Sequence, residues 1–146
     1  MGAIASGGVR VVNRSVIEEL GIPRSVFDAV AADEQQELER RERLYREQRP
    51  PLEVRNKSVI VTDDGLATGS TMRAATAALR QREPTRIVVA APVAAAATCA
   101  ALRPEVDAVV TVIQPEPFHG VGAWYADFRQ TTDDEVRALL SAAAGA

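Results

Sequence analysis

One stretch, residues 59–72 with the sequence VIVTDDGLATGSTM, constrains the fold of this chain more than any other. It opens with the β-branched run Val59–Val61, which has the composition of a buried parallel strand. After Thr71 the sequence MRAATAALRQR favours a helix. Two adjacent carboxylates, Asp63 and Asp64, and a small loop rich in glycine and hydroxyl groups lie between these segments. The stretch therefore predicts a strand, an acidic pair, a loop and a helix in that order.

That order predicts a ligand site, because ligands of open α/β sheets bind outside the carboxyl ends of the strands. The loop would present backbone N–H groups at a helix N-terminus, where the helix dipole favours an anion. Its residues are Gly65, Leu66, Ala67, Thr68, Gly69, Ser70 and Thr71. We expect a ligand with a phosphate at one end, bound by this loop, and a diol at the other, bound by Asp63 and Asp64.

Two alternatives compete with this phosphate site. A Walker phosphate loop fits poorly, because Ser70 follows Gly69 where that motif has lysine. An ordinary strand-to-helix turn with two solvated aspartates is the second alternative, and it leaves the length and order of the stretch unexplained.

Other β-branched segments predict that the strand belongs to a parallel sheet. Core strands are expected at Val59–Thr62, Arg86–Ala91 and Asp107–Ile113, and one additional strand at Val9–Val12. Helices are expected at about 71–82 and, after Pro92, at about 93–102. The alternation of strand and helix indicates an α/β fold with right-handed crossovers. A capping box of Ser15 with Glu18 predicts a short helix that ends at Gly21. A second capping box, of Thr132 with Glu135, predicts a helix that runs to about Ala144.

Residues 23–49 are expected to form a charged helical arm that begins near Pro23 and ends before Pro50 and Pro51. Its apolar positions make one thin stripe of Phe27, Val30, Leu38 and Tyr45. Charges of both signs alternate from residue 33 to residue 49. Two interpretations stay open: a solvated helical face, and a pairing arm for a second subunit or a mobile flap.

Composition limits the classes of partner. The 146 residues fit one domain. The net charge of −3, without a separate basic block, argues against nucleic acid as a partner. No apolar run approaches the length of a membrane span, so no membrane partner is expected. Cys99 is the single cysteine, which predicts a buried packing role and fits a reducing cytoplasm.

The stretch from Val59 to Thr71 resembles, in full, the 13-residue signature of type I phosphoribosyltransferases: four mostly apolar residues, two acids, a small loop and Thr-Gly-x-Thr. The resemblance implies that the loop Gly65–Thr71 holds the 5-phosphate of phosphoribosyl pyrophosphate (PRPP). It implies that Asp63 and Asp64 hold the ribose hydroxyls as the catalytic residues. Mg²⁺ would be bound mainly through PRPP, with no metal site of the protein's own, and the acceptor would be a small nitrogenous base.

The resemblance also implies an α/β, three-layer type I phosphoribosyltransferase-like fold with a parallel sheet, over a single domain of residues 1–146. The family's first two core strands and its pyrophosphate loop have no counterpart, so the domain is expected to be N-terminally incomplete. The sheet edge that this leaves exposed predicts a homodimer. Ala67 replaces the general-base Asp of 6-oxopurine members, and the loop alone looks more like that of adenine members.

Residues 114–146 are expected to form a C-terminal hood and helix, and Phe118–Val136 resembles a group of predicted bacterial phosphoribosyltransferases. Trp124 and Tyr125, with Phe128 nearby, are candidates for stacking on the acceptor, or for packing under the sheet edge. His119 is either a surface-loop histidine or a catalytic base. Arg129 is a candidate for a phosphate contact.

Three functions are compatible with the sequence. The first is transfer of a phosphoribosyl group from PRPP to a nitrogenous base, in cytoplasmic nucleotide metabolism. The second is a non-catalytic domain that binds PRPP or a nucleotide and regulates a partner. The third is a structural remnant whose loop binds any phosphate.

Overall fold

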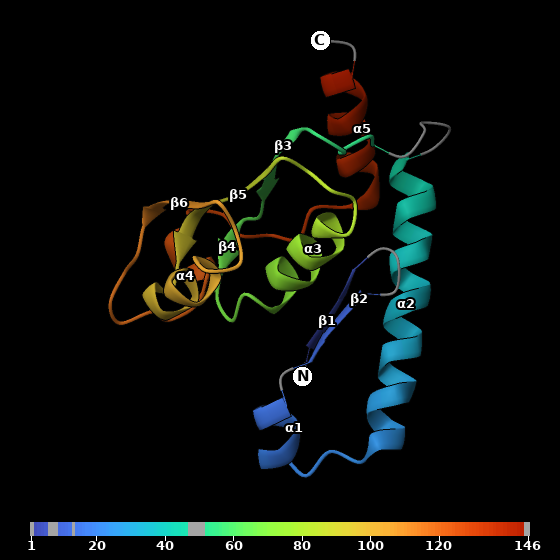
Figure 1. Ribbon diagram of the computed structural model, residues 1–146, viewed down its shortest axis with the longest axis vertical. Coiled ribbons are helices and arrows are strands. Elements are labelled where there is room, and N and C mark those ends of the chain that lie inside the picture. The colour runs from blue at the N-terminus through green and yellow to red at the C-terminus, as the bar shows by residue number, and fades with distance from the viewer. Residues whose placement is uncertain (1, 6–8, 13, 47–51, 145–146) are drawn as a thin grey trace.

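The centre of the protein is a parallel sheet, seen in a computed structural model that describes residues 2–5, 9–12, 14–46 and 52–144 (Figure 1). Strand β5 (Arg86–Ala94) lies in the middle. Strand β6 (Ala108–Ile113) pairs with one edge of β5, and β3 (Ser58–Thr62) and the short β4 (Gly65–Leu66) pair with the other. All these pairings are parallel, which confirms the predicted α/β sheet.

Helices α3 (Ser70–Arg80) and α4 (Ala96–Leu102) pack on one face of the sheet. Side chains alternate along β5, so that Ile87, Val89 and Ala91 face these helices and are buried. They share a core with Met72 of α3, and with Cys99 and Leu102 of α4, and these two residues of α4 are almost fully buried. The buried packing role predicted for Cys99 is therefore confirmed.

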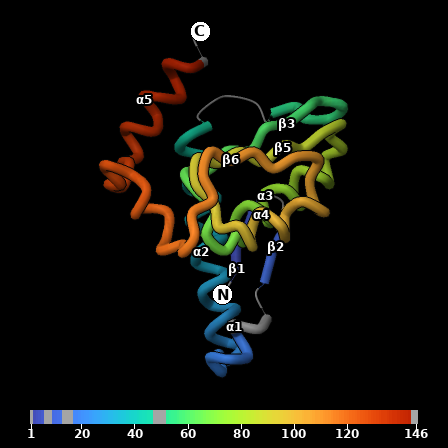
Figure 2. Tube along the Cα trace, turned by 90° about the vertical axis from the view of Figure 1, so that its left-hand side faces the viewer, coloured from blue at the N-terminus to red at the C-terminus, as the bar shows by residue number. Residues whose placement is uncertain are grey.

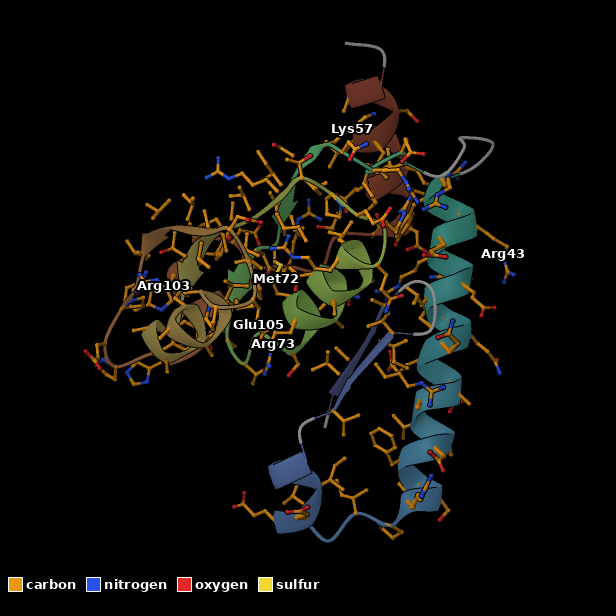
Figure 3. The ribbon with its side chains drawn as sticks, in the orientation of Figure 1. Arg43, Lys57, Met72, Arg73, Arg103 and Glu105 are labelled. Carbon is orange, nitrogen blue, oxygen red and sulfur yellow. The ribbon has the colours of Figure 1, made fainter. Side chains whose placement is uncertain are left out.

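The opposite face of the sheet carries exposed apolar side chains, Ile60 of β3 and Val110 and Val112 of β6. An ion pair joins the two helical segments, because Arg73 of α3 contacts Glu105, which follows α4, with an Nη2–Oε1 distance of 2.5 Å (Figure 3).

The N-terminal part of the chain adds an antiparallel hairpin and two helices. Strands β1 (Gly2–Ala5) and β2 (Val9–Val12) pair with each other and pack on α3. Helix α2 (Arg24–Arg46) runs along the outer side of the hairpin. Helix α1 (Arg14–Glu19) lies far from the parallel sheet in both views (Figures 1 and 2). The strand predicted at residues 9–12 is confirmed, and it pairs antiparallel with residues 2–5 in a two-stranded sheet of its own.

Several predicted helix boundaries differ from the observed ones. Ser15 was predicted to cap α1, but the helix begins at Arg14, so Ser15 lies inside it. The end at Gly21 is confirmed: its φ is +60°, and Ile22 N–H donates to the Ile17 carbonyl at 3.0 Å. Helix α4 starts three residues later than predicted, because Val93 still pairs in the sheet with β4 and β6.

The capping box at the last helix is confirmed. Helix α5 (Asp133–Ala144) begins after Thr132, whose N–H donates to Glu135 Oε2 at 2.9 Å, while the Glu135 N–H donates to Thr132 Oγ1 at 3.3 Å. The Arg129 guanidinium, and after it the hydrogen bonds that the Thr132 N–H and hydroxyl donate to the carboxylate, lower the pKa of Glu135 to about 2. Reciprocal bonds of this kind satisfy N–H groups that a helix start leaves without partners.

The charged arm is a helix over its described residues, 24–46. Most of its charged side chains are exposed, but Asp133 of α5 accepts hydrogen bonds from Arg40 Nη1 at 3.0 Å and from the Tyr45 hydroxyl at 2.5 Å. The arm is therefore joined to the C-terminal helix of its own chain at this point. Pro50 and Pro51, predicted to end the arm, lie outside the described residues.

Substituting Leu102 with alanine should lower the free energy of unfolding by about 2–5 kcal/mol, because the side chain is fully buried and its loss leaves a cavity. Leu139 of α5, which is 67% exposed, is a matched control whose substitution should change stability by less than about 0.5 kcal/mol. Urea unfolding measures both variants. Equal effects of the two substitutions would contradict the core described above.

Candidate functional site

The acidic pair lies at the carboxyl edge of the parallel sheet, directly after β3. The sequence predicted a loop from Gly65 onward, but Gly65 and Leu66 form β4 and pair with Val93 and Ala94. Asp63 and Asp64 therefore lie between two segments that are both fixed to β5. This double attachment holds the pair at the edge where α/β proteins bind ligands.

The backbone of Asp64 is hydrogen-bonded by side chains rather than by a neighbouring strand. Its N–H donates to Asp63 Oδ1 at 3.0 Å, and its carbonyl accepts the Tyr125 hydroxyl at 2.5 Å. Partial burial raises the pKa of the Asp63 carboxyl above its ordinary value. The hydrogen bond from the Asp64 amide acts to lower this pKa, and repulsion from the Asp64 carboxylate acts to raise it further. Both side chains are exposed enough to meet a ligand.

The loop after the pair forms the start of α3. Gly69 is the N-cap residue with φ +72°, a left-handed conformation that favours glycine, and its carbonyl accepts the first helical bond from Arg73 N–H at 2.9 Å. Thr68 Oγ1 accepts the Ser70 N–H at 3.4 Å and lies 3.3 Å from Ser70 Oγ. Exposed hydroxyl groups of Thr68 and Thr71 flank this helix N-terminus. Such an arrangement can bind an anion.

The C-terminal segment packs directly on the acidic pair, although it is about sixty residues away in sequence. A Cβ at Gly65 would lie 2.5 Å from Val121 Cγ1, so the segment leaves no room for a side chain there. Tyr125, which bonds to Asp64, has its ring centroid 5.2 Å from that of Phe128. Trp124 is 44% exposed beside it. The structure thus brings Tyr125 to the acidic pair and leaves Trp124 accessible.

The other two candidates of the C-terminal segment differ in their surroundings. His119 is exposed, as expected for a surface-loop histidine. Arg129 is engaged by the Glu135 carboxylate, with an Nη2–Oε1 distance of 2.8 Å, and lies 3.6 Å from an Asp127 carboxylate oxygen. This guanidinium is therefore already paired within its own segment.

Two contacts at the site were missed by the sequence reasoning. The Thr98 hydroxyl of α4 donates to the Ala67 carbonyl, and Val121 contacts Gly65. Thr98 lies in an alanine-rich stretch, where its hydroxyl is the one feature that sets it apart from the neighbouring alanines. Val121 lies in a turn-rich stretch, where its β-branched side chain is the corresponding feature. Both contacts join segments that the sequence alone does not place together.

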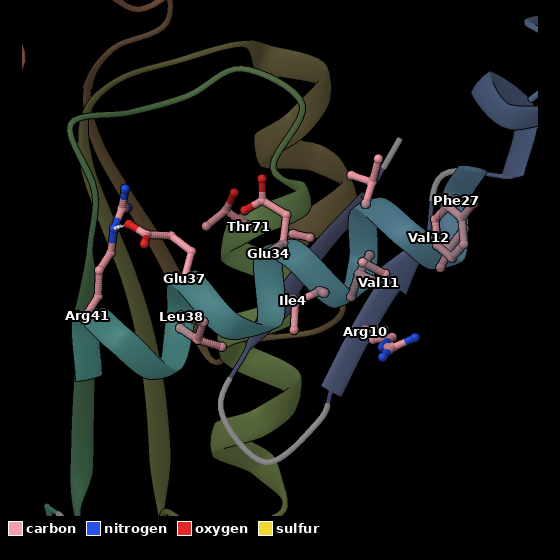
Figure 4. A pocket seen from close by; sticks show the side chains of 14 residues that line it. Ile4, Arg10, Val11, Val12, Phe27, Glu34, Glu37, Leu38, Arg41 and Thr71 are labelled. Carbon is pink, nitrogen blue, oxygen red and sulfur yellow. Dashed lines mark hydrogen bonds and ion pairs between the residues drawn. The ribbon is translucent and has the colours of Figure 1, made fainter. Parts of the chain in front are cut away.

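A cavity of about 490 Å³ lies between α2 and the β1–β2 hairpin (Figure 4). Its walls are mostly apolar, with Ile4, Val11, Phe27 and Leu38, and Glu34 and Arg41 also line it. Thr71 is the one signature residue among the side chains that line it. The cavity therefore adjoins the helix end of the signature and not the acidic pair.

Within residues 2–5, 9–12, 14–46 and 52–144, no group of three or more His, Cys, Asp or Glu side chains is arranged to hold a metal ion. The same residues contain no helix that is both long and apolar enough to span a membrane.

The parallel sheet and the strand–loop–helix unit at its edge define an α/β protein with a phosphoribosyltransferase-like fold. The crystal structure of TT1426 from Thermus thermophilus is similar, with a TM-score of 0.73 and 34% sequence identity, over 94% of this chain and 64% of that one. A family model described as "Phosphoribosyl transferase domain" matches residues 3–126. The chain belongs to this phosphoribosyl transferase family.

Two curated relatives, from the CDC 1551 and H37Rv strains of Mycobacterium tuberculosis, are both named "Putative phosphoribosyl transferase". Each is 35% identical to this chain over 142 residues, which is 97% of this chain. The chain spans 32% of the length of these relatives.

Substituting Asp63 with asparagine should raise the melting temperature at pH 7. Because folding raises the pKa of this carboxyl, the folded protein binds its proton more tightly than the unfolded chain, and ionisation lowers stability as the pH rises. Asparagine removes the charge and keeps an oxygen that can accept the Asp64 N–H. The gain should disappear at low pH, where the carboxyl is protonated in both states.

Thermal unfolding between pH 3 and pH 8 measures this difference, with the exposed Asp28 of α2 substituted by asparagine as the control. A melting temperature of the Asp63 variant below that of the wild type at pH 7 would show that the carboxylate is stabilised in the fold, against this prediction.

Proposed function

We propose that the chain binds PRPP through residues 63–71 and transfers its phosphoribosyl group to a nitrogenous base with release of pyrophosphate. One observation carries the proposal: an acidic pair and a helix N-terminus capped by a left-handed glycine lie at the two ends of one short segment at the carboxyl edge of the sheet. Family membership supports the reaction class. The acidic pair suits a diol, and the helix N-terminus suits a phosphate.

The two ends of the segment have different parts in this proposal. The loop of Gly65, Leu66, Ala67, Thr68, Gly69, Ser70 and Thr71 would hold the 5-phosphate through backbone N–H groups and through the hydroxyls of Thr68, Ser70 and Thr71. Asp63 and Asp64 would accept hydrogen bonds from the two ribose hydroxyls and orient the ring. Charge-assisted hydrogen bonds of this kind contribute roughly 1.5–3 kcal/mol each.

In the transfer, the bond between ribose C1 and the pyrophosphate oxygen breaks, and its electron pair leaves on pyrophosphate. The nitrogen lone pair of the base forms the new bond to C1, and the nitrogen proton passes to solvent. The carboxylates of Asp63 and Asp64 favour the positive charge that develops on the ribose ring. Holding both reactants in one place accounts for much of the rate enhancement.

Oxygen ligands of the kind that Asp63 and Asp64 offer suit Mg²⁺. In this proposal Mg²⁺ would be bound mainly through PRPP oxygens and water. When bound, Mg²⁺ neutralises the charge of the leaving pyrophosphate.

The acceptor would lie against the C-terminal segment. Trp124 has an exposed ring close to Tyr125, and the Tyr125 hydroxyl is occupied by the Asp64 carbonyl. Stacking of a flat base on these rings is therefore the contact that we propose, with no hydrogen bond from the Tyr125 hydroxyl to the base.

A regulatory domain that binds PRPP without turnover is the second candidate, and one observation favours it. Arg73, which follows the loop, and Arg129, in the C-terminal segment, are both paired with glutamates of this chain. Release of a highly charged leaving group is normally assisted by nearby cations. Binding would not need them to the same degree.

Thermal unfolding with PRPP and Mg²⁺ tests the shared part of both candidates. PRPP at one hundred times its dissociation constant should add about 2.7 kcal/mol of stability, or roughly 5–10 °C in melting temperature. The double substitution Asp63→Asn/Asp64→Asn should abolish the shift. The charge-matched control Asp28→Asn/Asp33→Asn, on exposed positions of α2, should retain it.

Inorganic phosphate and sulfate serve as the comparison ligands. Stabilisation by either that equals the effect of PRPP would contradict recognition of the diol. Pyrophosphate release on addition of purine or pyrimidine bases would establish the transferase, whereas a PRPP shift without any pyrophosphate release favours the regulatory domain.

A further inference from the structure

Helix α4 holds one side of the loop that leads into α3. The Thr98 hydroxyl donates a hydrogen bond to the Ala67 carbonyl, and the Ala95 N–H donates to the Leu66 carbonyl at 2.9 Å. Two successive carbonyl groups of the loop are therefore bound by residues at the start of α4.

These two bonds also fix the direction of the N–H groups in the same peptide units. A peptide unit is planar and trans, so its carbonyl and its N–H point in opposite directions. With the Leu66 and Ala67 carbonyls directed to α4, the N–H groups of Ala67 and Thr68 point away from α4. Successive N–H groups on one side of a turn form a concave site for an anion.

The methyl group of Thr98 packs against the loop at Gly69. A Cβ at Gly69 would lie 2.6 Å from Thr98 Cγ2 and 3.8 Å from Leu102 Cδ1. Leu102, one helical turn after Thr98, is fully buried, and so is nearly all of Cys99. The loop therefore rests on a helix that is itself anchored in the core.

The Thr98 hydroxyl does not stabilise helix α4 itself. The N-cap residue Ala95 makes no side-chain capping bond, and the hydroxyl is directed to the loop. Threonine also favours a helix less than the surrounding alanines do. Neither capping nor helix propensity accounts for this residue.

We propose that Thr98 is a positioning residue: it orients the loop backbone so that the N–H groups of Ala67 and Thr68 are available to the phosphate of the ligand. This inference rests on the proposed function of the loop. Thr98 itself does not touch the ligand. Its hydroxyl keeps the Ala67 carbonyl, whose partial negative charge would repel a phosphate, on the other side of the loop.

The test compares variants that separate the hydroxyl from the methyl group. Thr98→Val keeps the shape and removes the hydroxyl, whereas Thr98→Ser keeps the hydroxyl. Thr85→Val is the matched control, because Thr85 directly precedes β5, at the sheet edge opposite the loop, and its backbone N–H donates to the Lys57 carbonyl. Calorimetric titration measures binding of PRPP with Mg²⁺, and ¹⁵N chemical shifts report the Ala67 and Thr68 amides during titration with inorganic phosphate.

We expect Thr98→Val to weaken PRPP binding about tenfold, which corresponds to about 1.4 kcal/mol. Thr98→Ser and Thr85→Val should stay within about twofold of the wild type. Phosphate should shift the Ala67 and Thr68 amides in the wild type and in Thr98→Ser, and shift them less in Thr98→Val. Melting temperatures of the unliganded variants show that each one is folded.

Three outcomes would overturn the inference. Unchanged PRPP binding in Thr98→Val, with a wild type that binds, contradicts the role of Thr98 and leaves the proposed function standing. Loss of binding in Thr98→Ser equal to that in Thr98→Val shows that the hydroxyl is not the cause. A folded wild type that binds neither PRPP nor phosphate contradicts the proposed function and the role of Thr98 together.

Discussion

The parallel pairing of β5 with strands on both of its edges is the constraint on which the rest of the structure depends. Thr62 pairs with Ala90, and Gly65 with Val93, so the acidic pair is held at both ends by the same strand. Because β5 also pairs with β6, its buried side chains have a fixed direction, toward α3 and α4. The position of the candidate site follows from this register, and a shift of one residue would move the core side chains to the other face.

At the site, the features that favour a ligand are not those that favour stability. The Asp63 carboxyl has a raised pKa because burial and a second carboxylate disfavour its charge. Gly69 has a left-handed conformation and has no space for a side chain beside Thr98. Such conflicts are typical of functional sites, where the surrounding structure holds a local arrangement that is unfavourable by itself. Here that surrounding structure is the β5–α4 unit on one side and residues 121–128 on the other.

Much of the fold was predictable from local patterns. Three β-branched runs predicted the three main parallel strands, and Thr132 with Glu135 predicted the start of α5. The errors arose where pairing or packing overrides local preference. Val93 and Ala94 look helical beside the alanines that follow, but they pair with β4, and Gly65 and Leu66 look like a loop but form the strand that pairs with them. Ser15 carries a capping signal, yet α1 starts before it.

The sequence by itself determined the order of strand, acidic pair, loop and helix, because each of these depends on residues that are close together in the chain. It also indicated the family through one continuous run, residues 59–71. Only the tertiary structure decided which distant residues surround that run. Tyr125 bonds to Asp64, Val121 fills the space beside Gly65, and Thr98 bonds to Ala67. These contacts join segments separated by 31 to 61 residues. Their geometry is set by the register of β5 and the packing of α4, which no local pattern encodes.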